Sequence, residues 1–145
     1  MKARLFLIIT LITLATTSYA GDAKVPKVRE PEAQITELIE NLETGDIKQA
    51  FDLLLKGSAL AKRKPDALSA LVDQTKTVFE AYGLPTGYEV VETKKLGSRL
   101  INIKFISIHS DDNPMFWNTL FYKRGEHWEL LSVYFYDSPN KAGIL

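Results

Sequence analysis

The residues with the clearest potential for chemistry lie in one turn, His109-Ser110-Asp111-Asp112-Asn113-Pro114. A histidine beside two carboxylates can act as a general base oriented by an acid, or it can contribute to a metal site. Neighbouring residues of a strand point to opposite faces, however, and Asp, Asn and Pro are favoured in turns for their backbone geometry alone. We therefore expect an exposed hairpin loop, with the general-base or metal role as the less favoured alternative.

Other catalytic or ligating patterns are absent from the sequence. It contains no cysteine and two histidines, and it has no calcium loop, phosphate-binding glycine loop or nucleophile elbow. We expect no catalytic residues, no metal and no cofactor, and an enzyme is the less favoured class. The formal net charge of zero argues against nucleic acid as a partner, because nucleic-acid binding needs a concentrated positive field.

Aromatic residues mark a second candidate site. With strict alternation, the runs Met115–Lys123 and Trp128–Tyr136 each place apolar side chains on both faces of a sheet. Helices can cover only one face, so the other must be sheltered by curvature of the sheet, by a partner subunit or by a ligand. The partners expected are a second copy of the chain or, as alternatives, a small apolar ligand or an envelope protein. A homodimer is favoured over a ligand groove, because burying a sheet face needs no specific chemistry. Six residues are assigned to this ligand or dimer face: Tyr88, His109, Trp117, Trp128, Tyr134 and Tyr136.

The elements that position these residues are four consecutive strands. The strand-like runs are Tyr88–Leu96, Leu100–His109, Met115–Lys123 and His127–Asp137. β-Branched and aromatic residues dominate them, and short turn signals separate them, so an antiparallel meander is predicted.

Three helical regions precede the meander. The first begins near Pro31, and Gly45-Asp46 ends it and caps the second, which begins at Ile47. The third runs from Ala59 to Tyr82 and is interrupted at Pro65. Its expected buried line is Leu68, Leu71, Val72, Thr75, Phe79 and Tyr82. The predicted fold class is α+β, with N-terminal helices packed on one face of a curved four-stranded antiparallel meander.

The N-terminus predicts export. A basic start, an apolar run from Leu5 to Ala15, and small residues at the third and first positions before Gly21 are typical of a signal peptide cleaved at that point. The apolar run is too short to cross a bilayer, which needs about 20 residues, so we expect no stable membrane anchor. Residues 1–20 are therefore assigned to the signal peptide, 21–31 to a flexible arm and 32–145 to one α+β domain, in a periplasmic or secreted protein.

Two stretches resemble the nuclear transport factor 2-like (SnoaL-like, cystatin-like) superfamily. They are Leu42–Phe51, a helix–Gly-Asp–helix opening, and the aromatic hairpin and strand from Tyr122 to Asp137. The resemblance implies a curved sheet wrapped round helices into a cone, which often encloses a pocket and often dimerises through the sheet. This chain lacks a clear strand between its helices, so an abbreviated cone is expected.

The sequence therefore favours an exported binding or assembly module without catalytic activity, dimerising through its aromatic sheet face. The alternative is a cone-shaped enzyme or carrier for a small apolar molecule. Superfamily membership leaves both open, since one fold hosts many functions.

Overall fold

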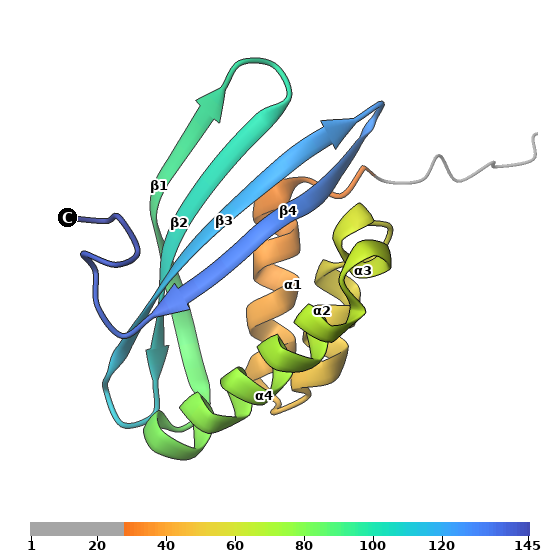
Figure 1. Cartoon of the computed structure of the whole chain (residues 1–145). Helices are drawn as coiled ribbons and strands as arrows, with labels where there is room; N and C mark the ends of the chain where they lie inside the picture. Colours follow the sequence, from red (N-terminus) through yellow and green to blue (C-terminus); the bar gives the residue numbers. More distant parts are fainter. Residues whose placement is uncertain (1–27) are drawn as a thin grey trace, which may run out of the picture.

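In residues 28–145, which the computed structural model describes, four helices are followed by four strands (Figure 1). The elements are α1 (Pro31–Glu43), α2 (Ile47–Leu54), α3 (Ala59–Arg63), α4 (Pro65–Tyr82), β1 (Pro85–Leu96), β2 (Leu100–His109), β3 (Pro114–Arg124) and β4 (His127–Tyr136). The predicted signal peptide, its cleavage point and most of the predicted arm lie outside these residues. No helix of the described part is long and apolar enough to span a membrane.

The helix boundaries follow local sequence signals. Pro31 occupies the first turn of α1, where its missing N–H costs nothing. Gly45 adopts a positive φ of 80° after α1, and the Asp46 side chain accepts a hydrogen bond of 3.2 Å from the Gln49 amide at the start of α2. The predicted caps are therefore confirmed.

The strands form an antiparallel sheet in the order β1-β2-β3-β4, and the helices lie on one side of it (Figure 1). The predicted α+β class and meander are confirmed. The largest buried apolar side chains of the sheet face the helices, and they are Ile103, Phe105, Trp117, Phe121 and Leu130. The helices contribute Ile35, Leu38, Ile39, Leu42, Phe51 and Leu54 to the same core.

A β-bulge at Leu131 changes which side chains of β4 face the helices. Leu130 pairs with Phe121 and Ser132 pairs with Leu120, which leaves Leu131 without an opposite residue. The extra residue reverses the alternation, because side chains in a strand repeat every two residues. Strict alternation along β4 was therefore wrong: Trp128 and Leu130 share the helix-facing side with Val133 and Phe135, while Ser132, Tyr134 and Tyr136 lie on the outer face.

The C-terminal segment, residues 138–145, lies against the outer face of the sheet (Figure 1). Asn118 of β3 donates a 3.0 Å hydrogen bond to the Ala142 carbonyl, and Lys104 of β2 donates one to the Gly143 carbonyl. Ala142 is 1% exposed. Lys104 also bonds Glu92 at 2.8 Å, and this contact lowers the pKa of Glu92. Part of the face that was expected to need a partner is thus covered by the chain itself.

The bulge makes a testable prediction about two adjacent leucines. Leu130 is fully buried, whereas Leu131 is 40% exposed. Leu130→Ala should lower the free energy of unfolding by about 2–5 kcal/mol, the usual cost of removing a buried leucine side chain. Leu131→Ala should lower it by less than about 1 kcal/mol, as surface changes do. Urea unfolding followed by circular dichroism measures both, and a larger loss at Leu131 would contradict the register.

Candidate functional site

A cleft of about 470 Å³ opens on the helix-facing side of the sheet, between the β1–β2 hairpin and the start of α1. Residues of all four strands line this cleft, which we call the concave cleft. Its lining residues are Glu30, Pro31, Glu32, Thr93, Lys95, Gly97, Ser98, Ile101, Ile103, Lys123 and Trp128. The side chains of Ile101, Ile103 and Trp128 also pack against the hydrophobic core, so the apolar part of the cleft is an open extension of that core.

Two lysines supply the positive charge of the cleft, Lys95 from β1 and Lys123 from β3. Within residues 28–145, no carboxylate oxygen lies within 4.0 Å of either ammonium group. The Lys123 Nζ atom lies 5.8 Å from the centroid of the Trp128 ring. Cations are attracted to an aromatic face at this distance, so the ring helps to place the ammonium group in the cleft.

Two carboxylates at the N-terminal end of α1 form the opposite wall of the cleft. Glu30 precedes the helix and Glu32 lies in its first turn, where negative charge is favourable. The Thr93 hydroxyl donates a 3.3 Å hydrogen bond to Glu32 Oε1, and Gln34 Nε2 donates one of 3.1 Å to the Trp128 carbonyl. These contacts tie both edge strands, β1 and β4, to α1 and fix the width of the cleft.

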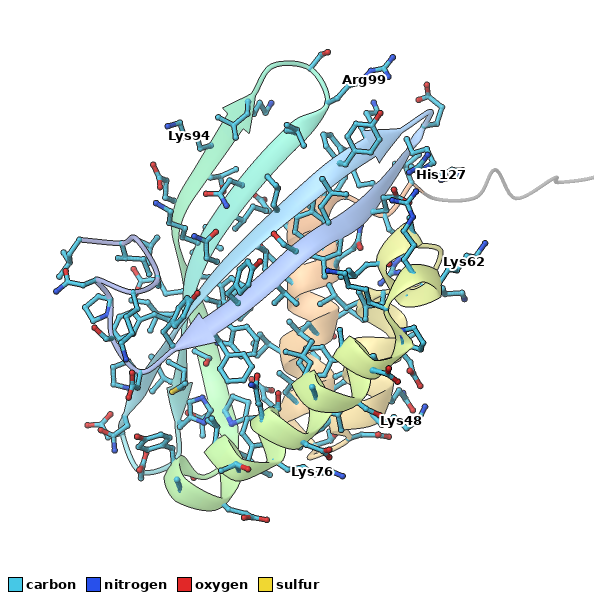
Figure 2. All side chains as sticks on the ribbon, in the orientation of Figure 1. Lys48, Lys62, Lys76, Lys94, Arg99 and His127 are labelled. Atoms are coloured by element: carbon cyan, nitrogen blue, oxygen red, sulfur yellow. The ribbon has the colours of Figure 1, made fainter. Side chains whose placement is uncertain are left out.

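The inward position of Lys95 depends on a second bulge. The β1–β2 register shifts between Val90 and Glu92, after which Thr93 pairs with Ile103 and Lys95 pairs with Ile101. Lys95 therefore lies on the helix-facing side, and Lys94 points away from the helices (Figure 2). No local signal in the sequence distinguishes the two lysines, because the bulge carries neither glycine nor proline.

His109 is buried rather than presented by a loop, with 2% of its surface exposed. Its Nδ1 atom lies 2.8 Å from the Gly83 carbonyl oxygen, and its Nε2 atom lies 3.1 Å from the Ser107 hydroxyl. The indole N–H of Trp117 donates to the same hydroxyl at 2.8 Å. A carbonyl only accepts, so the geometry assigns the imidazole proton to Nδ1 and makes Nε2 the acceptor of the Ser107 proton. This chain of hydrogen bonds satisfies every polar group in it.

The carboxylates of the turn do not reach His109. Asp111 accepts hydrogen bonds from the Asn113 side chain at 2.8 Å and from the Asn113 amide at 3.0 Å, and these bonds lower the pKa of Asp111. Asp112 has a positive φ of 66° and is exposed, as the turn geometry requires. In residues 28–145, no three His, Cys, Asp or Glu side chains are grouped to hold a metal ion.

The six residues that the sequence assigned to one face lie in several places. Trp117 is buried, its ring stacked 5.4 Å from that of Phe105, and His109 is in the same network. Tyr88 faces the helices and its hydroxyl lies 2.7 Å from that of Thr36, whereas Trp128 lines the cleft. Only Tyr134 and Tyr136 remain on the outer face, with ring centroids 6.5 Å apart. The common face assumed for the six residues does not exist.

Of the comparisons with known proteins, the one with solved structures found a similar fold. No family model matches this chain, and no curated protein matches it. A crystal structure from Campylobacter jejuni, provisionally described as an NTF2-like transpeptidase, superimposes with a TM-score of 0.51 at 17% sequence identity. The match covers 70% of this chain and 97% of the other. The fold is therefore NTF2-like, as the resemblance in the sequence implied.

The buried network predicts a structural role for His109. His109→Ala leaves the Gly83 carbonyl and the Ser107 hydroxyl without their partner, and it opens a cavity beside Phe79. The free energy of unfolding should fall by about 2–4 kcal/mol. His127→Ala, at the exposed tip of the β3–β4 hairpin (Figure 2), should change it by less than about 0.5 kcal/mol. Equal losses in urea unfolding would show that His109 has no such role.

Proposed function

We propose that this chain is an exported, non-catalytic binding module whose concave cleft takes a small molecule with an apolar body and an anionic group. The observation that carries the proposal is that Lys95 and Lys123 line the same cleft as the apolar side chains of Ile101, Ile103 and Trp128. Export is supported by the residue pattern of positions 1–20, which is that of a signal peptide.

The size and lining of the cleft suit a small ligand. Its volume of about 470 Å³ falls within the range of about 300–1,000 Å³ that is usual for small-molecule sites. Ile101 and Trp128 offer apolar surface, and the two ammonium groups offer charge and hydrogen-bond donors. Since neither ammonium group has a carboxylate partner in the described part of the chain, an anionic ligand group displaces no existing ion pair.

Binding is favoured over catalysis by the roles of the acid–base residues. A general base must reach the proton that it removes, and its partner must orient it. Both ring nitrogens of His109 are engaged in the buried network, and His109 does not line the cleft. Glu32 accepts a hydrogen bond from Thr93 and lies in the helix turn that its charge stabilises. These positions support a carrier or sensor rather than an enzyme.

The proposal predicts how a defined anionic probe binds. Anilinonaphthalene sulfonate (ANS) carries an apolar ring system and one sulfonate, and its fluorescence rises in apolar surroundings. Lys95→Gln should weaken its binding about ten-fold, and added salt should reduce this difference, because ionic strength screens the ammonium–sulfonate attraction. Lys94→Gln is the matched control, since Lys94 points away from the helices (Figure 2). Equal affinities for the two variants, or no binding by the parent chain, would contradict the proposal.

A homodimer through the outer face is proposed as the second property of the module. Tyr134 is 56% exposed and Ile108 is 42% exposed, and Phe116 and Tyr136 pair across β3 and β4 on the same face. These side chains provide apolar surface beside the C-terminal segment, and such surface on one face favours self-association.

Light scattering during size-exclusion chromatography tests the dimer. The parent chain should elute with the mass of two chains, and Phe116→Glu should give the mass of one, because a carboxylate would be buried in the interface. Gln49→Glu adds the same charge on exposed α2 and should leave the dimer intact. A parent chain that stays monomeric at high concentration would refute the dimer.

A further inference from the structure

The described sheet has two outer edges, one on β1 and one on β4, with which no strand pairs. An unpaired edge presents free amide and carbonyl groups to an incoming strand. On β4, the Trp128 carbonyl is taken by Gln34, and the bulge distorts the strand at Leu131. The regular part that remains is Ser132–Tyr136.

The two edges of the sheet are protected to different degrees. β1 carries charged side chains along most of its length, including Glu89, Glu92, Lys94 and Lys95. Charges on an edge strand discourage the addition of further strands. The stretch Leu130–Tyr136 of β4 carries none. β4 is therefore the edge that is chemically open to strand addition.

An apolar groove of about 450 Å³ runs beside this edge, between β4 and the helices α3 and α4, and we call it the β4-edge groove. Leu60 of α3, Leu68 and Leu71 of α4, and Val133 of β4 line it. Along α4, the expected buried line is buried only at Val72 and Thr75. Its other members pack against the core but stay half-buried, and they are Leu68, Leu71, Phe79 and Tyr82. The groove exists because α4 does not bring its remaining apolar side chains fully against the sheet.

We propose that the β4-edge groove binds an extended peptide segment of a partner protein, which adds a fifth strand to β4. The main chain of the segment would bond the free edge at Ser132–Tyr136. Every second side chain would enter the groove toward Leu68 and Leu71, because side chains of a strand alternate. Apolar residues at alternate positions are thus required of the partner.

The charge of the groove sets a further requirement for the partner. Lys64 is the one charged residue that lines the groove, and within residues 28–145 no carboxylate oxygen lies within 4.0 Å of its ammonium group. A segment with an acidic residue near Lys64 is favoured over a basic one by charge complementarity. The remaining polar lining consists of Gln74, Ser132 and Tyr134, which bond either sign of charge.

A second copy of this chain fits the groove poorly. Two β4 edges that pair about a two-fold axis perpendicular to the sheet place both helical layers on the same side. α3 and α4 of each copy flank the edge (Figure 1), so the two pairs of helices would meet where the strands need to join. A single extended segment brings no helices and avoids this collision.

Selection of random ten-residue peptides displayed on phage, with the purified protein as target, tests the proposal. The enriched peptides should carry apolar residues at alternate positions. Ala70→Trp fills the groove from an exposed position of α4, and it should weaken the enriched peptides at least ten-fold. Ser69→Trp is the matched control, since Ser69 is exposed on the same helix and does not line the groove. It should bind the peptides as the parent chain does.

Two further measurements separate strand addition from other modes. N-methylation of every second peptide amide should abolish binding in one phase of the alternation and spare it in the other, because only one set of amides faces β4. Binding should also slow hydrogen exchange of amides within Ser132–Tyr136. The proposal is overturned by any of four results: no enrichment over the Ala70→Trp variant, peptides with helical spacing, peptides that tolerate Ala70→Trp, or self-association that Ala70→Trp abolishes.

Discussion

Burial of one sheet face under α1 and α2 is the constraint on which the rest of the structure depends. Phe105 and Trp117 stack at the centre of this face, and Phe51 of α2 is fully buried in the same core. α1 begins at Pro31, so the part of the sheet face that lies past the N-terminal end of this helix stays open as the concave cleft. Hydrogen bonds from β1 to Glu32 and from Gln34 to β4 set how closely the helix approaches. The core and the cleft are thus two parts of one apolar surface.

The other surfaces follow from what the helices leave uncovered. On the outer face, residues 138–145 are held by Asn118 and Lys104, which divides that face and reduces the area available to a second copy. Beside β4, the helix α4 keeps most of its apolar side chains half-buried, which leaves a groove next to an unpaired strand edge. Each surface has a distinct chemistry: the cleft is apolar with two lysines facing two carboxylates, the outer face is aromatic, and the strand edge from Leu130 to Tyr136 is uncharged.

The sequence predicts the fold far better than it predicts the site. Turn signals, β-branched runs and helix caps are local, so the meander and the boundary at Gly45-Asp46 could be predicted. The bulge at Leu131 could not, because Leu130 and Leu131 are the same residue type and only the pairing with β3 distinguishes them. Burial of His109 could not be predicted either, because it depends on hydrogen-bonding groups of Gly83 and Trp117, which lie in separate segments of the chain. Lys95 is turned inward by a bulge that no glycine or proline marks.

The most direct test of the cleft uses the two tryptophans of the chain, whose indole N–H groups give separate signals in a proton–nitrogen correlation spectrum. Trp128 lines the cleft, whereas the indole of Trp117 is bonded to Ser107 in the core. Titration with ANS is predicted to move the Trp128 indole signal together with the amides of Ile101 and Ile103, and to leave the Trp117 indole signal in place. Shifts confined to the outer face, or equal shifts of both indole signals, would contradict a ligand site in the cleft.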